Sequence, residues 1–245
     1  MNKLVPFLLG IIFFFTLPQL TKAQNDCCGV GSIFSSLVQS GVFGGYGMQQ
    51  YDAKGLNDVL PVGAGFNDFG TAWGWRAGAN LIAIRQNDFI VALKFYYQAL
   101  TEKQEITGDT GGEPYTQELK LNLNQLNLGM SFSYILNKSF DFRIFDAYLM
   151  WTSAKLTNSF TMNNPPADDV YKSPESNIGF SFDTGLVYYP LPPYLSFEVL
   201  GGYSIFSIDK ANLDSGSSEL TSIPDLVYGG GFFAVAVLTV GIPFN

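Results

Sequence analysis

The sequence predicts an all-β fold, an eight-stranded antiparallel up-and-down transmembrane β-barrel. Three observations support this: eight strand-like segments follow Gly41, most of them alternate apolar and polar residues, and their connections alternate between short and long. The short connections are 85–87, 137–138 and the proline corner 190–193, and the long polar ones are roughly 51–68, 101–113, 158–175 and 209–224. A closed barrel in an outer membrane has this rhythm, because short turns face the periplasm and longer loops face outside.

The N-terminal residues have the pattern of a secretory signal peptide, which is removed from the mature protein. Lys3 supplies the positive charge, Leu4–Leu17 form the apolar stretch, and Thr21-Lys22-Ala23 offer a small-residue cleavage site. That apolar stretch is short for a membrane-spanning helix. We expect a signal peptide at 1–23, a periplasmic N-terminal arm with the apolar spacing of a short helix at 24–40, and an outer-membrane β-barrel at 41–245.

Two adjacent cysteines, Cys27 and Cys28, follow the cleavage site. They are too close for a relaxed internal disulfide and lack the other ligands of a zinc site. Lipidation of Cys27 is disfavoured because the preceding Gln24-Asn25-Asp26 is not a small-residue motif. An exposed or intermolecularly oxidised pair is the favoured interpretation, and its role stays open.

The net charge of −8 argues against nucleic acid as a partner, since phosphates require a basic face. After the signal peptide, the nearest candidate for a membrane-spanning helix is Leu226–Ile242, which carries no charge, but its glycines and valines favour a strand over a helix. A membrane role would therefore require a barrel, because backbone groups in lipid must be paired internally.

The first segment, Val42–Gln50, is glycine-rich and has the weakest pattern. The second, third, sixth and seventh segments alternate clearly: in the third, one face is apolar throughout while Lys94 and Gln98 lie on the other. From this alternation we expect the following side chains to face lipid: Phe89, Val91, Leu93, Phe95, Phe180, Phe182, Leu195 and Phe197.

Two segments change phase partway along. In the fourth, the apolar row of Leu119, Leu121 and Leu123 resumes one residue out of phase at Leu126, and in the fifth the row shifts at Phe145. Either a β-bulge shifts the faces, or the outer half of each strand has left the membrane and needs no apolar face. The last segment, Leu226–Phe244, is apolar on both faces, which leaves its phase open.

The signal peptide, the strand count and the aromatic C-terminal strand 240–245 resemble the small outer-membrane β-barrel proteins of Gram-negative bacteria, of OmpA and OmpX type, here without a periplasmic domain. The resemblance implies an outer-membrane location with both termini periplasmic. It also implies contact with membrane lipid and lipopolysaccharide, and recognition of the C-terminal strand by the barrel-assembly machinery. The family usually ends on an aromatic residue, whereas here Phe244 is penultimate and Asn245 is last.

The sequence contains no histidine, the usual base or orienting group for nucleophilic catalysis. We therefore expect no enzyme, no catalytic residue, no cofactor and no metal site. An eight-stranded barrel is only wide enough for side chains to fill it, and buried charges must be paired. Three cations and three anions predict a neutralised lumen: Arg76, Lys94, Asp141, Arg143, Asp183 and Glu198. A narrow polar conduit or a catalytic carboxylate pair is the alternative.

The sequence thus predicts a non-enzymatic outer-membrane protein, porin-like in architecture, with a plugged lumen and acidic extracellular loops. Its expected role in the cell envelope is structural or interaction with a partner, such as another outer-membrane protein. A component for transport of small solutes or hydrophobic ligands is the first alternative. A secreted soluble ligand-binding barrel is the second. The sequence names no partner, ligand or oligomeric state.

Overall fold

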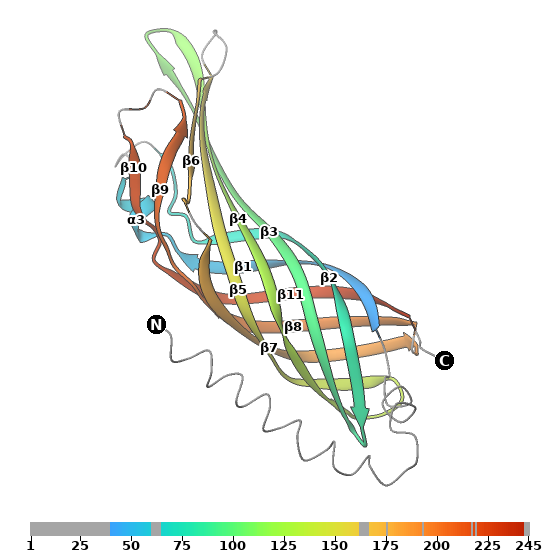
Figure 1. Ribbon diagram of the computed structural model, residues 1–245. Helices are drawn as coiled ribbons and strands as arrows, with labels where there is room; N and C mark the ends of the chain where they lie inside the picture. Colours follow the sequence, from blue (N-terminus) through green and yellow to red (C-terminus); the bar gives the residue numbers. More distant parts are fainter. Residues whose placement is uncertain are drawn as a thin grey trace, which may run out of the picture.

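The computed structural model describes residues 40–59, 65–161, 167–174, 176–192, 194–216, 218 and 220–242. The predicted signal peptide, almost all of the arm at 24–40, both cysteines and the last three residues lie outside this range. The elements, shown in Figure 1, are β1 (Ser40–Asp52), α3 (Lys54–Val59), β2 (Thr71–Gln86), β3 (Phe89–Thr110), β4 (Glu113–Ile135), β5 (Phe140–Thr161), β6 (Ala167–Lys172), β7 (Asn177–Leu191), β8 (Leu195–Ile205), β9 (Ile208–Ser215), β10 (Ser222–Val227) and β11 (Gly229–Ile242).

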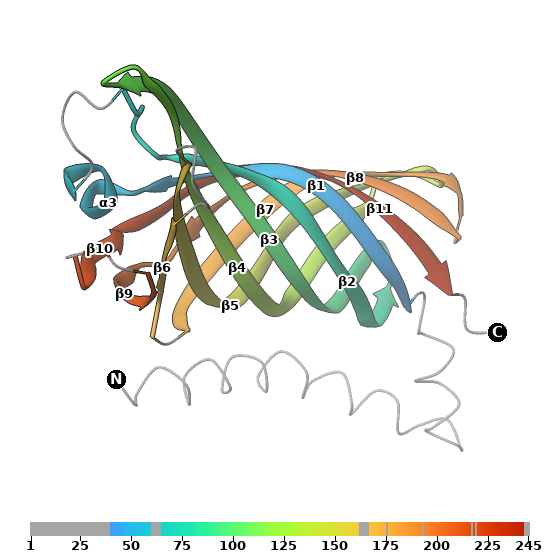
Figure 2. The same cartoon turned by 90° about the horizontal axis from the view of Figure 1, so that it is seen from above.

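Eight of these strands close into a barrel. Each pairs antiparallel with its neighbours in the order β1–β2–β3–β4–β5–β7–β8–β11, and β11 returns to pair with β1 from Ser40↔Ile242 to Asp52↔Gly229. Figure 2 shows these strands around the barrel. This closure confirms the predicted eight-stranded antiparallel up-and-down fold. The glycine-rich first segment is a regular strand, β1, with ten residues in register with β2.

The two ends of the barrel differ. The β2–β3, β4–β5 and β7–β8 connections are short, and we call their end the short-turn end. At the opposite, extended end, β3, β4 and β5 continue together for 22, 23 and 22 residues. A membrane-spanning strand needs only about 9–11 residues, so these three strands reach well beyond that length.

The long connections at the extended end were predicted as loops, and this prediction was wrong for much of their length. Residues 103–110 of β3 pair with 113–120 of β4, with a tight turn at Gly111 and Gly112, whose φ values are +69° and +89°. β6 pairs with the outer half of β5, β9 with β6, and β10 with β9. Polar composition there reflects exposure to water and not the absence of strands.

The first long connection contains a short helix, α3. The helix α3 packs against β10, and a Cβ at Gly55 would lie 2.2 Å from the carbonyl oxygen of Asp225. Asn57 exchanges side-chain hydrogen bonds with the backbone of Phe69 at 3.0 and 2.9 Å. Figure 1 shows α3, β9, β10 and β6 gathered at one end of the barrel. Within the described ranges, no helix is long and apolar enough to cross a membrane.

The two phase changes have different causes. In β5 the register with β7 shifts between Arg143 and Asp146, so the predicted bulge is present there. In β4 the register with both neighbours is continuous from Leu119 to Phe132, so a bulge is the wrong explanation. The inward row simply changes from polar to apolar, as the second interpretation proposed.

An apolar core fills the extended end. It includes Leu121 and Leu123 from β4, Met150 from β5, Ile208 from β9 and Leu226 from β10, all fully buried. The interior of the barrel is therefore apolar in this half. Beyond the membrane-length segment an apolar side chain gains most from facing inward, because outside it would meet water.

Candidate functional site: a charged lumen inside an apolar wall

Large apolar side chains cover the outside of the barrel. Every one of the eight barrel strands exposes some, for example Tyr46 on β1, Trp75 on β2 and Phe182 on β7. The eight residues predicted to face lipid all lie on this outer side, exposed or half-exposed. An apolar surface this continuous greatly exceeds the patches of ordinary soluble monomers.

Aromatic pairs mark both limits of this apolar wall. Toward the short-turn end, Phe89 packs on Tyr134 with ring centroids 5.3 Å apart, and Phe140 packs on Tyr188 at 5.0 Å. Toward the extended end, Trp75 packs on Tyr97 at 5.6 Å. Farther along β3 the outward residues become polar, from Lys103 through Asp109. Such aromatic girdles occur where a barrel passes between lipid and water.

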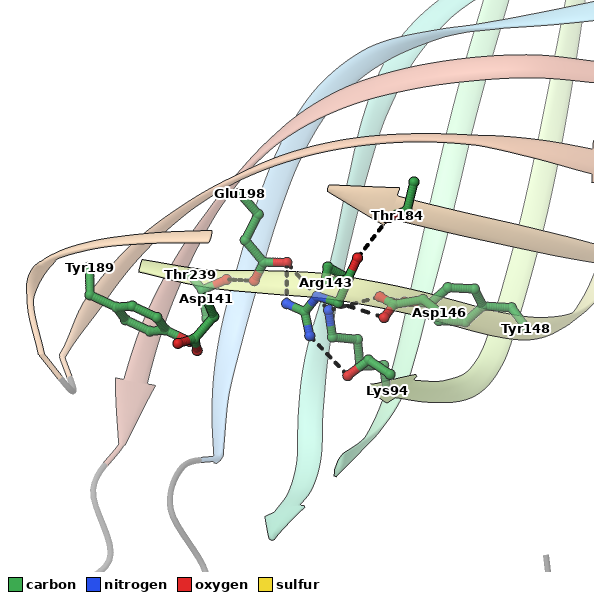
Figure 3. A network of polar contacts seen from close by, with 10 residues as sticks. Lys94, Asp141, Arg143, Asp146, Tyr148, Thr184, Tyr189, Glu198 and Thr239 are labelled. Atoms are coloured by element: carbon green, nitrogen blue, oxygen red, sulfur yellow. Dashed lines mark hydrogen bonds and ion pairs between the residues drawn. The ribbon is translucent and has the colours of Figure 1, made fainter. Parts of the chain in front are cut away.

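The lumen near the short-turn end holds an ion-pair network, shown in Figure 3. Arg143 Nη2 lies 2.7 Å from Glu198 Oε2, and Lys94 Nζ lies 3.4 Å from the same oxygen. Lys94 Nζ is also 3.4 Å from Asp146 Oδ2, and Arg143 Nε is 3.6 Å from Asp146 Oδ1. Two cations and two anions from β3, β5 and β8 thus contact one another in a fully enclosed position.

Neutral donors complete this network. Thr239 Oγ1 donates to Glu198 Oε1 at 3.0 Å, and Tyr148 donates its hydroxyl proton to Asp146 Oδ2 at 2.9 Å. Arg143 Nη1 donates to Ser131 Oγ at 3.0 Å. Buried ion pairs persist when hydrogen bonds satisfy their remaining atoms, and these contacts supply most of them.

All six charged residues predicted for the lumen are buried, and they divide into three groups. Lys94, Arg143 and Glu198 belong to the network. Asp141 lies apart from it and accepts a hydrogen bond of 2.7 Å from Tyr189. The remaining two, Arg76 and Asp183, form no ion pair or hydrogen bond that the described residues show. The Arg76 guanidinium lies over the rings of Tyr96 and Phe233, at 5.0 and 5.6 Å.

Sequence reasoning missed Asp146, which is fully buried at the centre of the network. The bulge at Ile144 and Phe145 turns two successive apolar residues outward and therefore reverses the phase of β5. The shift in the apolar row was visible in the sequence. If the shifted alternation is continued from Phe145 to the next residue, Asp146 is predicted to face the lumen.

Further buried polar side chains lie in the lumen. A belt of amides lies between the network and the apolar core, where Gln98 donates to Gln49 at 3.1 Å and Gln49 donates to Ser204 at 2.8 Å. Beside Lys94, Arg143 and Glu198 there is a cavity of about 30 Å³. That volume has room for a buried water or two. In the described part of the chain, no group of three acidic or cysteine side chains could hold a metal ion.

No protein-family model matches this sequence. No curated protein matches it either. Similar solved structures include the attachment invasion locus protein Ail of Yersinia pestis, in complex with the heparin analogue sucrose octasulfate, at 10% identity and a TM-score of 0.40, covering 84% of this chain and 99% of that one.

Neisserial surface protein A is similar at 12% identity and a TM-score of 0.32, covering 82% of this chain and 96% of that one. The outer membrane protease OmpT of Escherichia coli is similar at 10% identity and a TM-score of 0.36, covering 84% and 95%. These weak likenesses concern the fold alone. The strand pairing by itself establishes that this chain forms a closed eight-stranded antiparallel barrel.

Proposed function

We propose that this protein spans the outer membrane of a Gram-negative bacterium as a closed, non-conducting and non-enzymatic barrel. The observation that carries the proposal is that apolar side chains lie outside and charged side chains inside, the reverse of their distribution in soluble proteins. Large apolar residues cover the outside of all eight barrel strands, whereas Lys94, Arg143 and Glu198 lie inside. In water this arrangement would expose the apolar wall, so lipid is the solvent that suits it.

Extraction and electrophoresis test the membrane assignment. The protein should resist carbonate washing of membranes and require detergent for release. It should also migrate on gels faster before heating than after, because a closed barrel stays compact in detergent. Release by carbonate alone would support the soluble ligand-binding barrel instead.

Closure of the lumen supports a role other than transport. A solute would have to pass the ion-pair network, the amide belt and the apolar core in turn, and these side chains are buried. The refolded protein in a planar bilayer should therefore show no discrete channel openings. Steps of regular conductance would favour the transport alternative.

The extended end supports a role in interaction with a partner. β6, β9 and β10 extend the barrel sheet, and with α3 they cover an apolar core shared with β2–β5, although membrane anchoring alone does not need them. Acidic side chains outnumber basic ones there, as in Asp52, Asp58, Glu105 and Asp109. We infer that the partner presents positive charge, because complementary potentials favour encounter.

A photo-crosslinking residue tests this role. Placed at the exposed Thr107, it should link the protein to a partner in intact cells, and high salt should reduce the yield. The same residue at Phe182, within the apolar wall, is the control. Protein adducts at Phe182 but not at Thr107 would assign the interaction to the wall of the barrel.

A further inference from the structure

The lumen contains one buried carboxylate that the ion-pair network leaves uncompensated. Asp183 on β7 is 4% exposed, and neither of its carboxylate oxygens has a hydrogen-bond partner among the described residues. A buried ionised carboxylate without partners is strongly unfavourable, and it is usually neutralised or ligated.

A second carboxylate with an oxygen that accepts no hydrogen bond lies directly across the sheet from Asp183. Asp146 on β5 is the direct cross-strand partner of Asp183, and both side chains point into the lumen. Directly opposite residues of antiparallel strands have Cβ atoms about 4.5–5.5 Å apart, which lets two carboxyl groups meet. Asp146 Oδ2 accepts from Tyr148 and Lys94, but Asp146 Oδ1 accepts no hydrogen bond and has only the Arg143 Nε charge beside it, at 3.6 Å.

The cations of the lumen do not supply the missing charge directly. Lys94 and Arg143 are shared between Asp146 and Glu198, which already balances two positive charges with two negative ones. Arg76 on β2 acts on Asp183 only from a distance, since its guanidinium packs over Tyr96 and Phe233. Asp141 lies farther toward the short-turn end, where Tyr189 and the charge of Arg85 face it.

We propose that Asp146 and Asp183 bind one proton between them. Asp183 takes the proton from bulk water and becomes a neutral carboxylic acid, and its O–H donates to Asp146 Oδ1, which stays ionised. One proton therefore satisfies the two unpartnered groups and removes the uncompensated charge. The packing around Asp183 is close, which favours a proton over a larger ligand. Gly202 is the β8 partner of Asp183, and a Cβ there would lie 2.7 Å from Asp183 Cβ.

Other groups around the pair shape this site. Lys94 and Tyr96 reach it from β3, Arg143 and Tyr148 from β5, and Arg76 from β2. Glu198 on β8 shares Lys94 and Arg143 with Asp146. Lys94 and Arg143 form ion pairs with Asp146, at 3.4 and 3.6 Å. The tyrosine hydroxyls are neutral donors.

The first experiment is infrared spectroscopy of the folded barrel in detergent at neutral pH. The wild type should show the carbonyl stretch of a protonated carboxyl group, and Asp183→Asn should lack it. Asp141→Asn, which changes another buried carboxylate of the lumen, should retain the band. No difference between the wild type and Asp183→Asn would overturn the proposal.

The second experiment is urea unfolding of the same proteins over a range of pH, followed by tryptophan fluorescence. The unfolding midpoint of the wild type should fall as pH rises, because the unfolded aspartate is ionised and the folded pair must release its proton. Asp183→Asn keeps a donor for Asp146 Oδ1, so its midpoint should equal or exceed that of the wild type and lose this pH dependence.

Two outcomes would show that a group other than a proton compensates the charge of Asp183. If Asp183→Asn is less stable at every pH and no protonated band exists, Arg76 compensates an ionised Asp183 and the proposal is wrong. If the midpoint instead depends on sodium or potassium against choline at equal ionic strength, and no protonated band is seen, the pair binds an alkali ion and not a proton.

Discussion

Leu123 and Leu126 lie three residues apart on β4 and face opposite sides of the barrel wall. Leu123 is 0% exposed and belongs to the apolar core, whereas Leu126 is 37% exposed on the outer surface. Between them the strand keeps its register with both neighbours. In the proposed membrane orientation, the position where the apolar side of the strand changes therefore marks where the surroundings of the barrel change from lipid to water.

Shortening these two leucines should have unequal effects. Leu121→Ala, in the core beside Leu123, should cost about 2–5 kcal/mol of unfolding free energy because it leaves a cavity. Leu126→Ala should cost much less, since lipid can fill the space. Urea midpoints of the two variants in lipid vesicles measure the difference. Equal losses would contradict the assignment of Leu126 to the lipid side.

A charge in the apolar wall should impair assembly. Leu93→Arg places a cation on the outer side of β3, at a cost of roughly 2–4 kcal/mol near the middle of a bilayer. The fraction of protein that migrates as the compact form before heating reports assembly. Asp109→Arg, at the exposed tip of the β3–β4 hairpin, is the control and should assemble normally. Equal tolerance at both positions would be inconsistent with a lipid-facing wall.

Removal of one member of the ion-pair network should be costly. Glu198→Ala leaves Arg143 and Lys94 without their shared carboxylate, and breaking a buried pair typically costs about 3–5 kcal/mol. Glu113→Ala, which removes an exposed carboxylate, should leave the urea midpoint near that of the wild type. A small effect at Glu198 would show that water enters and solvates the network.

The contact between α3 and β10 should depend on Gly55. A methyl group there would meet the carbonyl oxygen of Asp225, so Gly55→Ala should displace α3 while the barrel stays closed. Hydrogen exchange of residues 53–58 should accelerate, and heat-modifiable migration should not change. Gly111→Ala in the β3–β4 turn is the comparison. It has free space around its Cβ, and its positive φ confines the strain to that turn.

The barrel could be predicted from the sequence because an apolar outer surface and a crowded lumen impose a period of two. Phe89 to Phe95 and Phe180 to Phe182 show it directly. The extended end could not be predicted in this way. Residues such as Lys103 and Thr107 are polar whether a segment is a loop or a strand in water, and only pairing with β4 distinguishes the two states.

The charged lumen could be predicted only in part. The alternation along each strand placed Lys94 and Glu198 in the lumen. Which charges contact one another depends instead on how the strands pair around the barrel. Asp146 was missed because a single inserted residue in β5 reverses every later position. Local alternation does not show such a shift unless it is followed across the whole strand.

The pairing of Ser40 with Ile242 has a consequence for how the barrel is made. The strands that complete the ring come from opposite ends of the described chain, so closure must await synthesis of the last one. Until then, the edges of β1 and of the most recently added strand carry unsatisfied amide and carbonyl groups. Contacts so distant in sequence form slowly, and such edges readily aggregate. A long-lived open intermediate should therefore precede the finished ring, and a protecting factor would be needed to shield it.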